Sequence, residues 1–172
     1  EIRGEIFMPL QEFEKLNKDR KKNGLPLFAN PRNTASGTLK LQDSGVVAKR
    51  NLDCFLYGLY QDRAEQTSHF DSVSFAGEMG FKIPRIAENM IAKVSNVDGI
   101  LDFIAYWEDK RKDLPFEIDG IVIKVNSYRQ QEELGYTAKS PRWAISFKYK
   151  TERVETELKS VSYQVGRTGA IT

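Results

Sequence analysis

The sequence predicts an α+β fold in which the sheets are largely antiparallel. Strand-like segments with alternating or β-branched residues occur near the start, the middle and the end of the chain, and amphipathic helical patterns lie between them. The two kinds of segment do not alternate regularly, as they would in a parallel sheet built from βαβ units. With 172 residues, of which 40% are hydrophobic, the chain can bury one sizeable core. We therefore expect a single main domain.

The first two elements follow from hydrophobic spacing. In residues 1–8, Arg3, Glu5 and Phe7 point to one side and mostly apolar residues to the other, which predicts a half-buried strand. Residues 10–24 carry apolar side chains three positions apart and end at a glycine. That pattern predicts a short amphipathic helix.

The middle of the chain predicts a loop, a strand and a helix. Residues 28–40, FANPRNTASGTLK, are rich in loop-forming residues and predict a shaped loop that runs into a helix. Residues 54–60 read as a buried strand, in which Cys54 is a core residue. Ser95 and Asp98 have the spacing of a capping box and predict the start of a further helix.

Two strong strands and a possible third one follow. Residues 117–126, EIDGIVIKVN, and 142–150, RWAISFKYK, are dense in β-branched or alternating residues. Residues 161–172 end inside a strand-like pattern, and the chain starts at Glu1 instead of a methionine. We therefore expect the chain to be a fragment of a longer protein.

Composition excludes some classes of protein. No apolar run approaches the roughly 20 residues that cross a bilayer, so we expect a cytoplasmic protein without a membrane partner. A single cysteine allows neither an internal disulfide nor a cysteine zinc site. Residues 1–50 and 120–172 are basic and residues 51–119 are acidic, so the two outer segments would suit a phosphate backbone if they folded side by side. Solvated surface charge is the simpler explanation of the same pattern.

Four charged residues interrupt strand patterns. Lys124 and Lys148 lie within apolar strands, where an ammonium needs an anionic partner or a route to solvent. Glu5 and Asp119 are carboxylates at similar positions, and the set could form a nucleotide or metal-phosphate site. Ordinary solvent-facing strands are the alternative. Asp119 and Lys124 are five apart and would face opposite sides of a regular strand, unless Gly120 permits a bulge.

Six motifs, taken together, resemble the NAD-dependent DNA ligases and separate the chain from ATP-dependent ligases and capping enzymes. In order along the sequence, they are RGEIFM (3–8), FANPRNTASGTLK (28–40), FLYG (55–58), EIDGIVIKVN (117–126), LGYTAKSPRWAISFKYK (134–150) and VGRTGAIT (165–172). The resemblance implies that residues 1–160 belong to a nucleotidyltransferase (ligase adenylation) domain lacking its N-terminal part. Residues 161–172 would begin an OB-fold domain.

The resemblance also implies an activity. The whole enzyme would seal 5′-phosphate/3′-hydroxyl nicks in duplex DNA through enzyme-AMP and DNA-adenylate intermediates, releasing NMN and AMP. NAD would donate the AMP, Mg²⁺ would assist, and nicked double-stranded DNA would be the partner in replication and repair. A monomer in the bacterial cytoplasm is expected, and zinc only in a C-terminal part outside this chain.

Matching positions imply roles for individual residues. Glu5 would bind the AMP ribose, and Tyr57 would stack on adenine, although a core aromatic explains Tyr57 equally well. Lys124 would reach the adenine edge. Lys148 would neutralise the transferring phosphate, and Asp119 would organise Mg²⁺ or the lysines, which makes these two residues the catalytic pair.

Other residues are expected to lie at the surface or to contact DNA. Arg32 matches an arginine that engages DNA or phosphates, and Lys40 stands where the family often has arginine, so both are expected to bind DNA. Arg111 aligns with an arginine near the active site but also fits the charged end of a solvated helix. His69 lies in a polar connection and is expected at the surface.

The nucleophile is expected outside this chain. The family uses the lysine of a K-x-D-G motif that precedes the RGE strand, whereas residues 96–99 here, NVDG, are better explained as a helix start. The fragment alone should therefore be inactive. The alternatives are a non-catalytic nucleic-acid-binding module and an ATP-dependent nucleotidyltransferase. Glu5, Lys124 and Lys148 facing one cavity would favour the ligase over the binding module.

Overall fold

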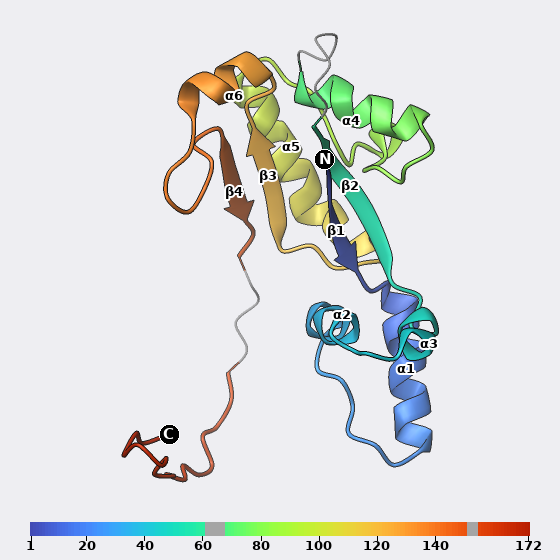
Figure 1. Cartoon of the computed structure of the whole chain (residues 1–172), viewed down its shortest axis with the longest axis vertical. Helices are drawn as coiled ribbons and strands as arrows, with labels where there is room; N and C mark the ends of the chain where they lie inside the picture. Colours follow the sequence, from blue (N-terminus) through green and yellow to red (C-terminus); the bar gives the residue numbers. More distant parts are fainter. Residues whose placement is uncertain (61–67, 151–154) are drawn as a thin grey trace.

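The computed structural model describes residues 1–60, 68–150 and 155–172, and within them it confirms the mixed α+β class (Figure 1). The strands are β1 (Ile2–Phe7), β2 (Asp53–Leu59), β3 (Gly120–Lys124) and β4 (Ala144–Lys148). The α-helices are α1 (Leu10–Lys22), α2 (Pro31–Leu39), α3 (Ser44–Ala48), α4 (His69–Glu78), α5 (Val97–Lys110) and α6 (Tyr128–Leu134). Two short 3₁₀ helices are η1 (Ile86–Glu88) and η2 (Arg111–Asp113). Across these ranges no helix has the length and apolar character needed to span a bilayer.

Both sheets are antiparallel pairs: β1 pairs with β2, and β3 pairs with β4. Helices α1, α2 and α3 gather at one end of the β1–β2 pair, and α4 and α6 lie toward the other end (Figure 1). In the β1–β2 pair the register slips, because Gly4 faces Leu56 while Arg3 faces Gly58. Tyr57 is left without a partner on β1. Such a bulge redirects the local backbone and side chain.

An aromatic cluster joins the first sheet to the segment before β3. The rings of Phe7 and Phe55 stack with centroids 5.2 Å apart, and Phe116 contacts both at 4.7 and 5.4 Å. Helix α4 packs on β2 and buries Val73 and Ala76. The other buried hydrophobic residues of the described chain are Met8, Ala35, Leu59, Trp107, Phe116, Trp143 and Tyr149.

The first two predicted strands exist, but they are more exposed than the sequence suggests. Ile2 and Ile6 are 42% and 46% exposed, so the prediction of a half-buried β1 is wrong for most of its length. In β2 only Gly58 and Leu59 are buried, and Cys54 is half-buried instead of a core residue. The reason is that these strands form a two-stranded sheet in the described residues, and a two-stranded sheet shields little of its own surface.

Helix α2 confirms that the FANPRN segment runs into a helix. Asn30 has an extended backbone, and its side-chain oxygen accepts the N–H of Asn33 at 2.8 Å. Pro31 stands at the first helical position, where its fixed φ favours helix initiation. The helix therefore begins within the motif, earlier than a loop-rich composition suggests.

Some sequence-based boundaries are wrong. Asn96, and not Ser95, caps α5, because its side chain accepts the N–H of Gly99 at 2.9 Å. Helices α3, α4 and α6 are not predicted from the sequence. Within residues 155–172 the expected terminal strand is reduced to one bridge, between Val165 and Ile171, because the segment pairs only with itself.

Gly120 allows the close approach of β3 to β4. A Cβ at this position would lie 2.1 Å from the carbonyl oxygen of Phe147 and 3.0 Å from the Cα of Lys148, so the backbone would have to shift. We expect Gly120→Ala to lower the free energy of unfolding by about 1–3 kcal/mol. Denaturant unfolding measures the change. Gly37→Ala is the matched control, because it has open space within α2 and should be neutral or stabilising. Equal stabilities for the two variants would contradict the prediction.

Candidate functional site

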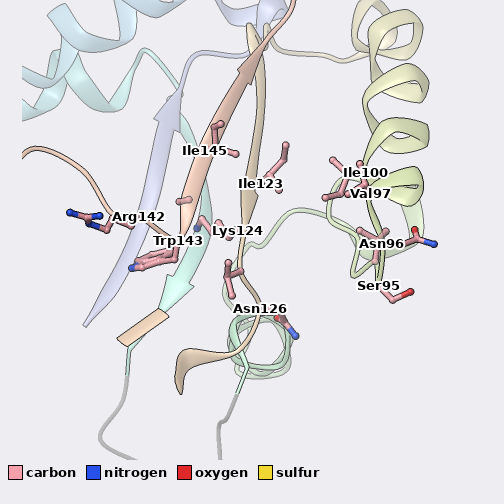
Figure 2. Close-up of a pocket in the computed structure, with 13 residues that line it drawn as sticks. Ser95, Asn96, Val97, Ile100, Ile123, Lys124, Asn126, Arg142, Trp143 and Ile145 are labelled. Carbon is pink, nitrogen blue, oxygen red and sulfur yellow. The ribbon is translucent and has the colours of Figure 1, made fainter. Parts of the chain in front are cut away.

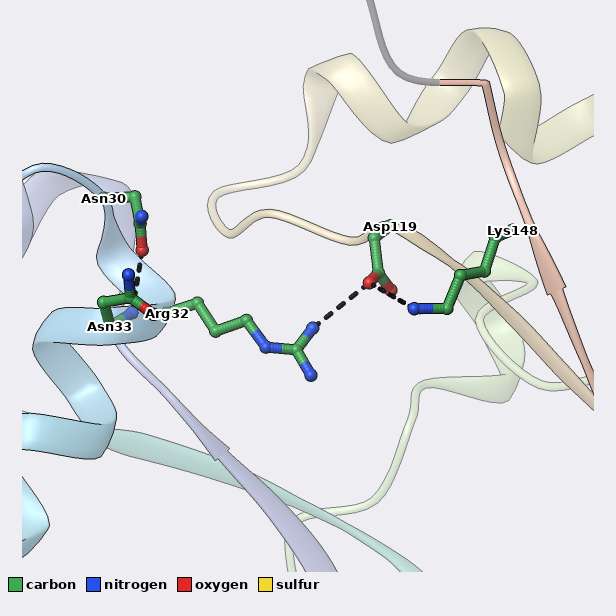
Figure 3. A network of polar contacts seen from close by, with 5 residues as sticks. All are labelled: Asn30, Arg32, Asn33, Asp119 and Lys148. Carbon is green, nitrogen blue, oxygen red and sulfur yellow. Dashed lines mark hydrogen bonds and ion pairs between the residues drawn. The ribbon is translucent and has the colours of Figure 1, made fainter. Parts of the chain in front are cut away.

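Asp119 lies between two cations that come from distant parts of the chain. Its Oδ2 accepts a hydrogen bond from Arg32 Nη1 at 3.2 Å and from Lys148 Nζ at 3.3 Å (Figure 3). The three side chains are 56–73% exposed, so each ion pair is screened and contributes little to stability. Both cations therefore remain accessible to an anionic ligand.

Backbone contacts hold this ion cluster in place. Arg32 projects from the first turn of α2, whose start is fixed by the Asn30 cap. The carbonyl of Asp119 accepts the N–H of Tyr149, and the next residue, Gly120, is paired with Lys148. Strand alternation would place Asp119 and Lys124 on opposite faces, but Asp119 precedes the first residue of β3, so the alternation does not apply to it. Its carboxylate can therefore reach Lys148, which shares a sheet face with Lys124.

Lys124 ends β3 and forms a second cluster with β2 and α4. Its Nζ lies 3.4 Å from the carbonyl oxygen of Tyr57, 3.2 Å from Nε2 of His69 and 4.6 Å from the Tyr57 ring centroid. Burial, and secondarily the charge of Arg3, lower the pKa of Lys124 to about 8. Of the two strand lysines, Lys124 is half-buried, whereas the Lys148 side chain is 68% exposed.

The expectation of a surface histidine is wrong. His69 is the first residue of α4 and is buried, and its main-chain N–H bonds to the carbonyl of Asn126, two residues after Lys124. Burial lowers the pKa of His69 to about 4, and the charge of Lys124 adds to the shift. The Tyr57 carbonyl, which would accept a hydrogen bond from the protonated ring, partly opposes it. The sequence around His69 is polar and therefore does not indicate that a helix starts there and docks next to the end of β3.

Glu5 and Lys40 are not brought into either cluster. Glu5 faces Phe55 across the β1–β2 pair and is exposed, without a hydrogen bond or ion pair to the described residues. Lys40 is the C-terminal cap of α2, at the opposite end of that helix from Arg32. The ribose-binding and DNA-binding roles of these two residues stay predictions.

Arg111 packs against Tyr149, a residue that contacts the Asp119 backbone. Its guanidinium packs over the ring of Tyr149 at 4.9 Å, and Tyr149 in turn bonds to the Asp119 backbone. Its Nε is buried without a hydrogen-bond partner in the described part of the chain. Both interpretations of Arg111, a site arginine and the charged end of a helix, stay open.

The face of β3–β4 that carries Ile123 and Ile145, opposite to Lys148, lines a cavity of about 450 Å³ against α5 (Figure 2). Ile123 and Ile145 face Ile100 across it, and Lys124 contributes to its wall. Neither Glu5 nor Lys148 lines this cavity. A single cavity shared by Glu5, Lys124 and Lys148 therefore stays a prediction.

The donor set around Asp119 bears on metal binding. Within the ranges that the structure describes, no three His, Cys, Asp or Glu residues gather as a metal site would require. Asp119 can supply one carboxylate. Mg²⁺ is commonly held by one or two carboxylates together with substrate phosphates and water, so Asp119 fits a metal only with a phosphate ligand present.

Comparison with known proteins places this arrangement in a family. Residues 1–152 match the model for the NAD-dependent DNA ligase adenylation domain. The whole chain is 52% identical to a DNA ligase of Parabacteroides distasonis, and 54% identical to DNA ligases of Phocaeicola vulgatus and Flavobacterium psychrophilum. In each case the match covers 100% of this chain and 25% of the relative, so the chain spans about a quarter of these proteins.

Proposed function

Because this chain belongs to the NAD-dependent DNA ligase adenylation-domain family, we propose that it forms the nucleotide- and phosphate-binding part of a DNA ligase. The whole enzyme would transfer AMP from NAD to a lysine, then to the 5′-phosphate of a nick, and would seal the nick with release of AMP. Residues 1–160 would belong to the adenylation domain and residues 161–172 to the start of an OB-fold domain. The enzyme would act as a cytoplasmic monomer.

The observation that carries this proposal is the ion cluster of Arg32, Asp119 and Lys148. Two exposed cations share one carboxylate oxygen, at 3.2 and 3.3 Å. Before a phosphate binds, Asp119 holds both cations in place. A phosphate that enters the cluster can then replace Asp119 as the partner of either cation. Such prearranged charge stabilises a transferring phosphoryl group without reorganisation during the reaction. If Mg²⁺ takes part, Asp119 is the carboxylate available to it.

The second cluster suits the adenosine half of the nucleotide. Tyr57 offers a partly exposed ring and Lys124 an ammonium beside it, while Glu5 would bind the ribose from the neighbouring strand. The ammonium covers one face of the Tyr57 ring, so adenine would stack on the other face or displace the ammonium. To contact the base, Lys124 would have to move from its position over the ring to the edge of the ring.

Arg32→Ala tests the phosphate role in the full-length ligase. We expect slower nick sealing and weaker DNA binding, because one phosphate contact is lost. The dependence of log affinity on log salt concentration should become shallower by about 1. Nick-sealing assays and DNA-binding titrations at several salt concentrations measure both effects.

Arg129→Ala provides the matched control for Arg32→Ala. Arg129 is an exposed arginine that pairs with Glu133 within α6, away from the ion cluster. The control should keep the wild-type salt dependence. An unchanged salt dependence in Arg32→Ala as well would show that Arg32 does not contact a phosphate.

A further inference from the structure

We propose that His69 is a positioning residue for Lys124, with its Nε2 accepting a hydrogen bond that holds the lysine ammonium beside Tyr57. This inference rests on the proposed function, because it assumes that Lys124 contacts the nucleotide. The Nε2 to Nζ distance is 3.2 Å. The lysine can donate to Nε2 only if that nitrogen is unprotonated, so the ring proton belongs on Nδ1.

The backbone fixes the two residues next to each other. The carbonyl of Asn126 accepts the N–H of His69, and the Asn126 side chain accepts the N–H of Phe70. Ser68 and Ser127 form an antiparallel bridge immediately beside these bonds. The start of α4 is thereby attached to the chain just after β3 ends at Lys124. The contact between His69 and Lys124 therefore follows from how the two backbone segments are paired.

Several groups keep the imidazole uncharged and able to accept. His69 is only 6% exposed and lies next to the Lys124 ammonium. It also stands at the N-terminus of a 10-residue helix, where the helix dipole disfavours a positive charge. The titratable groups that face this cluster from other elements are Arg3, Tyr60 and Tyr128, and none of them is an anion at neutral pH. Among the described residues, the site therefore offers Lys124 an acceptor and no carboxylate.

Hydrogen-bond geometry explains what the acceptor provides. An ammonium has three hydrogens. The Tyr57 carbonyl, which belongs to the bulge residue of β2, and His69 Nε2 use two of them. The third remains for a ligand. When adenine stacks on the Tyr57 ring and the ammonium shifts toward the ring edge, these two acceptors limit how far it can move from the base.

The location of the histidine also argues against a purely structural role. Nδ1 of His69 is buried without a hydrogen-bond partner among the described residues. A buried donor without a partner costs about 1–3 kcal/mol, a cost that an apolar residue of similar size would avoid. The group that benefits from an imidazole here is Lys124.

The test compares His69→Leu and His69→Gln in the full-length ligase that carries this chain. Rates of enzyme-AMP formation are measured against NAD concentration, together with thermal unfolding. His69→Leu removes the acceptor and should raise KM for NAD by about tenfold or more, the effect of losing one hydrogen bond to a charged group. The rate at saturating NAD should change much less. His69→Gln restores an acceptor and should return KM close to the wild-type value.

A double-mutant comparison shows whether His69 acts through Lys124. In a Lys124→Ala background, His69→Leu should add no further increase in KM. Tyr128→Phe is the matched packing control, because the Tyr128 ring contacts His69 at 6.2 Å between centroids while its hydroxyl bonds to Leu59 instead of Lys124. This control should keep the wild-type KM. If His69→Leu does not fold, His69→Met serves as the apolar variant.

The outcomes separate this inference from the proposed function. The positioning role is overturned if His69→Leu has a wild-type KM, or if it raises KM by the same factor in the Lys124→Ala background as in the wild type. In both cases, a raised KM in Lys124→Ala still supports nucleotide binding by Lys124. A normal KM in Lys124→Ala overturns both. Failure of His69→Gln to restore KM, with unchanged thermal stability, also counts against an acceptor role.

Discussion

Lys148→Ala in the full-length ligase is expected to slow the transfer of AMP from NAD by at least about a hundredfold. The ammonium of Lys148 is exposed and is held by Asp119 in the ion cluster with Arg32. As the bond to the transferred phosphate changes, charge shifts onto the phosphate oxygens. A fixed cation that contacts them lowers the energy of the transition state more than that of the bound substrate. Single-turnover formation of enzyme-AMP measures the loss directly.

The same variant should still fold. An exposed ion pair contributes only about 0–1 kcal/mol, so thermal unfolding of Lys148→Ala should be close to that of the wild type. Lys150→Ala is the matched control, because Lys150 is two residues away, exposed and without an ion pair to the described residues. Near-normal adenylylation in Lys148→Ala would contradict the catalytic role. A rate loss of the same size in Lys150→Ala would show that the rate depends on the positive charge of this region and not on the position of Lys148.

The 172-residue chain by itself is expected not to form a covalent AMP adduct. Covalent transfer requires an unprotonated amine aligned with the α-phosphate. By resemblance to the family, that amine belongs to a K-x-D-G motif, which is not found among these residues. Among the lysines of the described residues, Lys124 is the strongest substitute, because burial lowers its pKa to about 8 and so favours the free amine.

The prediction therefore depends on where Lys124 lies, and not on its charge alone. Its Nζ lies against His69 and the Tyr57 carbonyl, beside the ring proposed for adenine and not in the cluster proposed for phosphate. Incubation with adenine-labelled NAD and Mg²⁺, followed by denaturation and mass measurement, tests the prediction. The full-length ligase is the positive control, and a stoichiometric adduct on the chain would place the nucleophile within residues 1–172.

The sequence by itself determined the α+β class, the helix at residues 10–22, the four strand positions and the identity of the charged residues that interrupt strands. These features depend on neighbours a few positions away. Alternation marks β4, and three-residue spacing marks α1, whatever the rest of the chain does. The family could be predicted for the same reason, since its motifs are short and contiguous. Glu5, Lys124, Lys148 and Asp119 could be identified as candidates because a charge within a strand pattern is visible locally.

The tertiary structure alone decided which of these residues meet. Arg32 reaches Asp119 across 87 positions of sequence, and His69 reaches Lys124 across 55. Neither contact has a local signal. Arg32 reaches Asp119 through its long side chain, and His69 meets Lys124 because the start of α4 is attached to the chain just after β3. The burial of His69 and the bulge at Tyr57 have the same origin: both depend on pairing between distant segments. Periodicity describes which side of a strand a residue faces, but only packing between segments determines what lies opposite it.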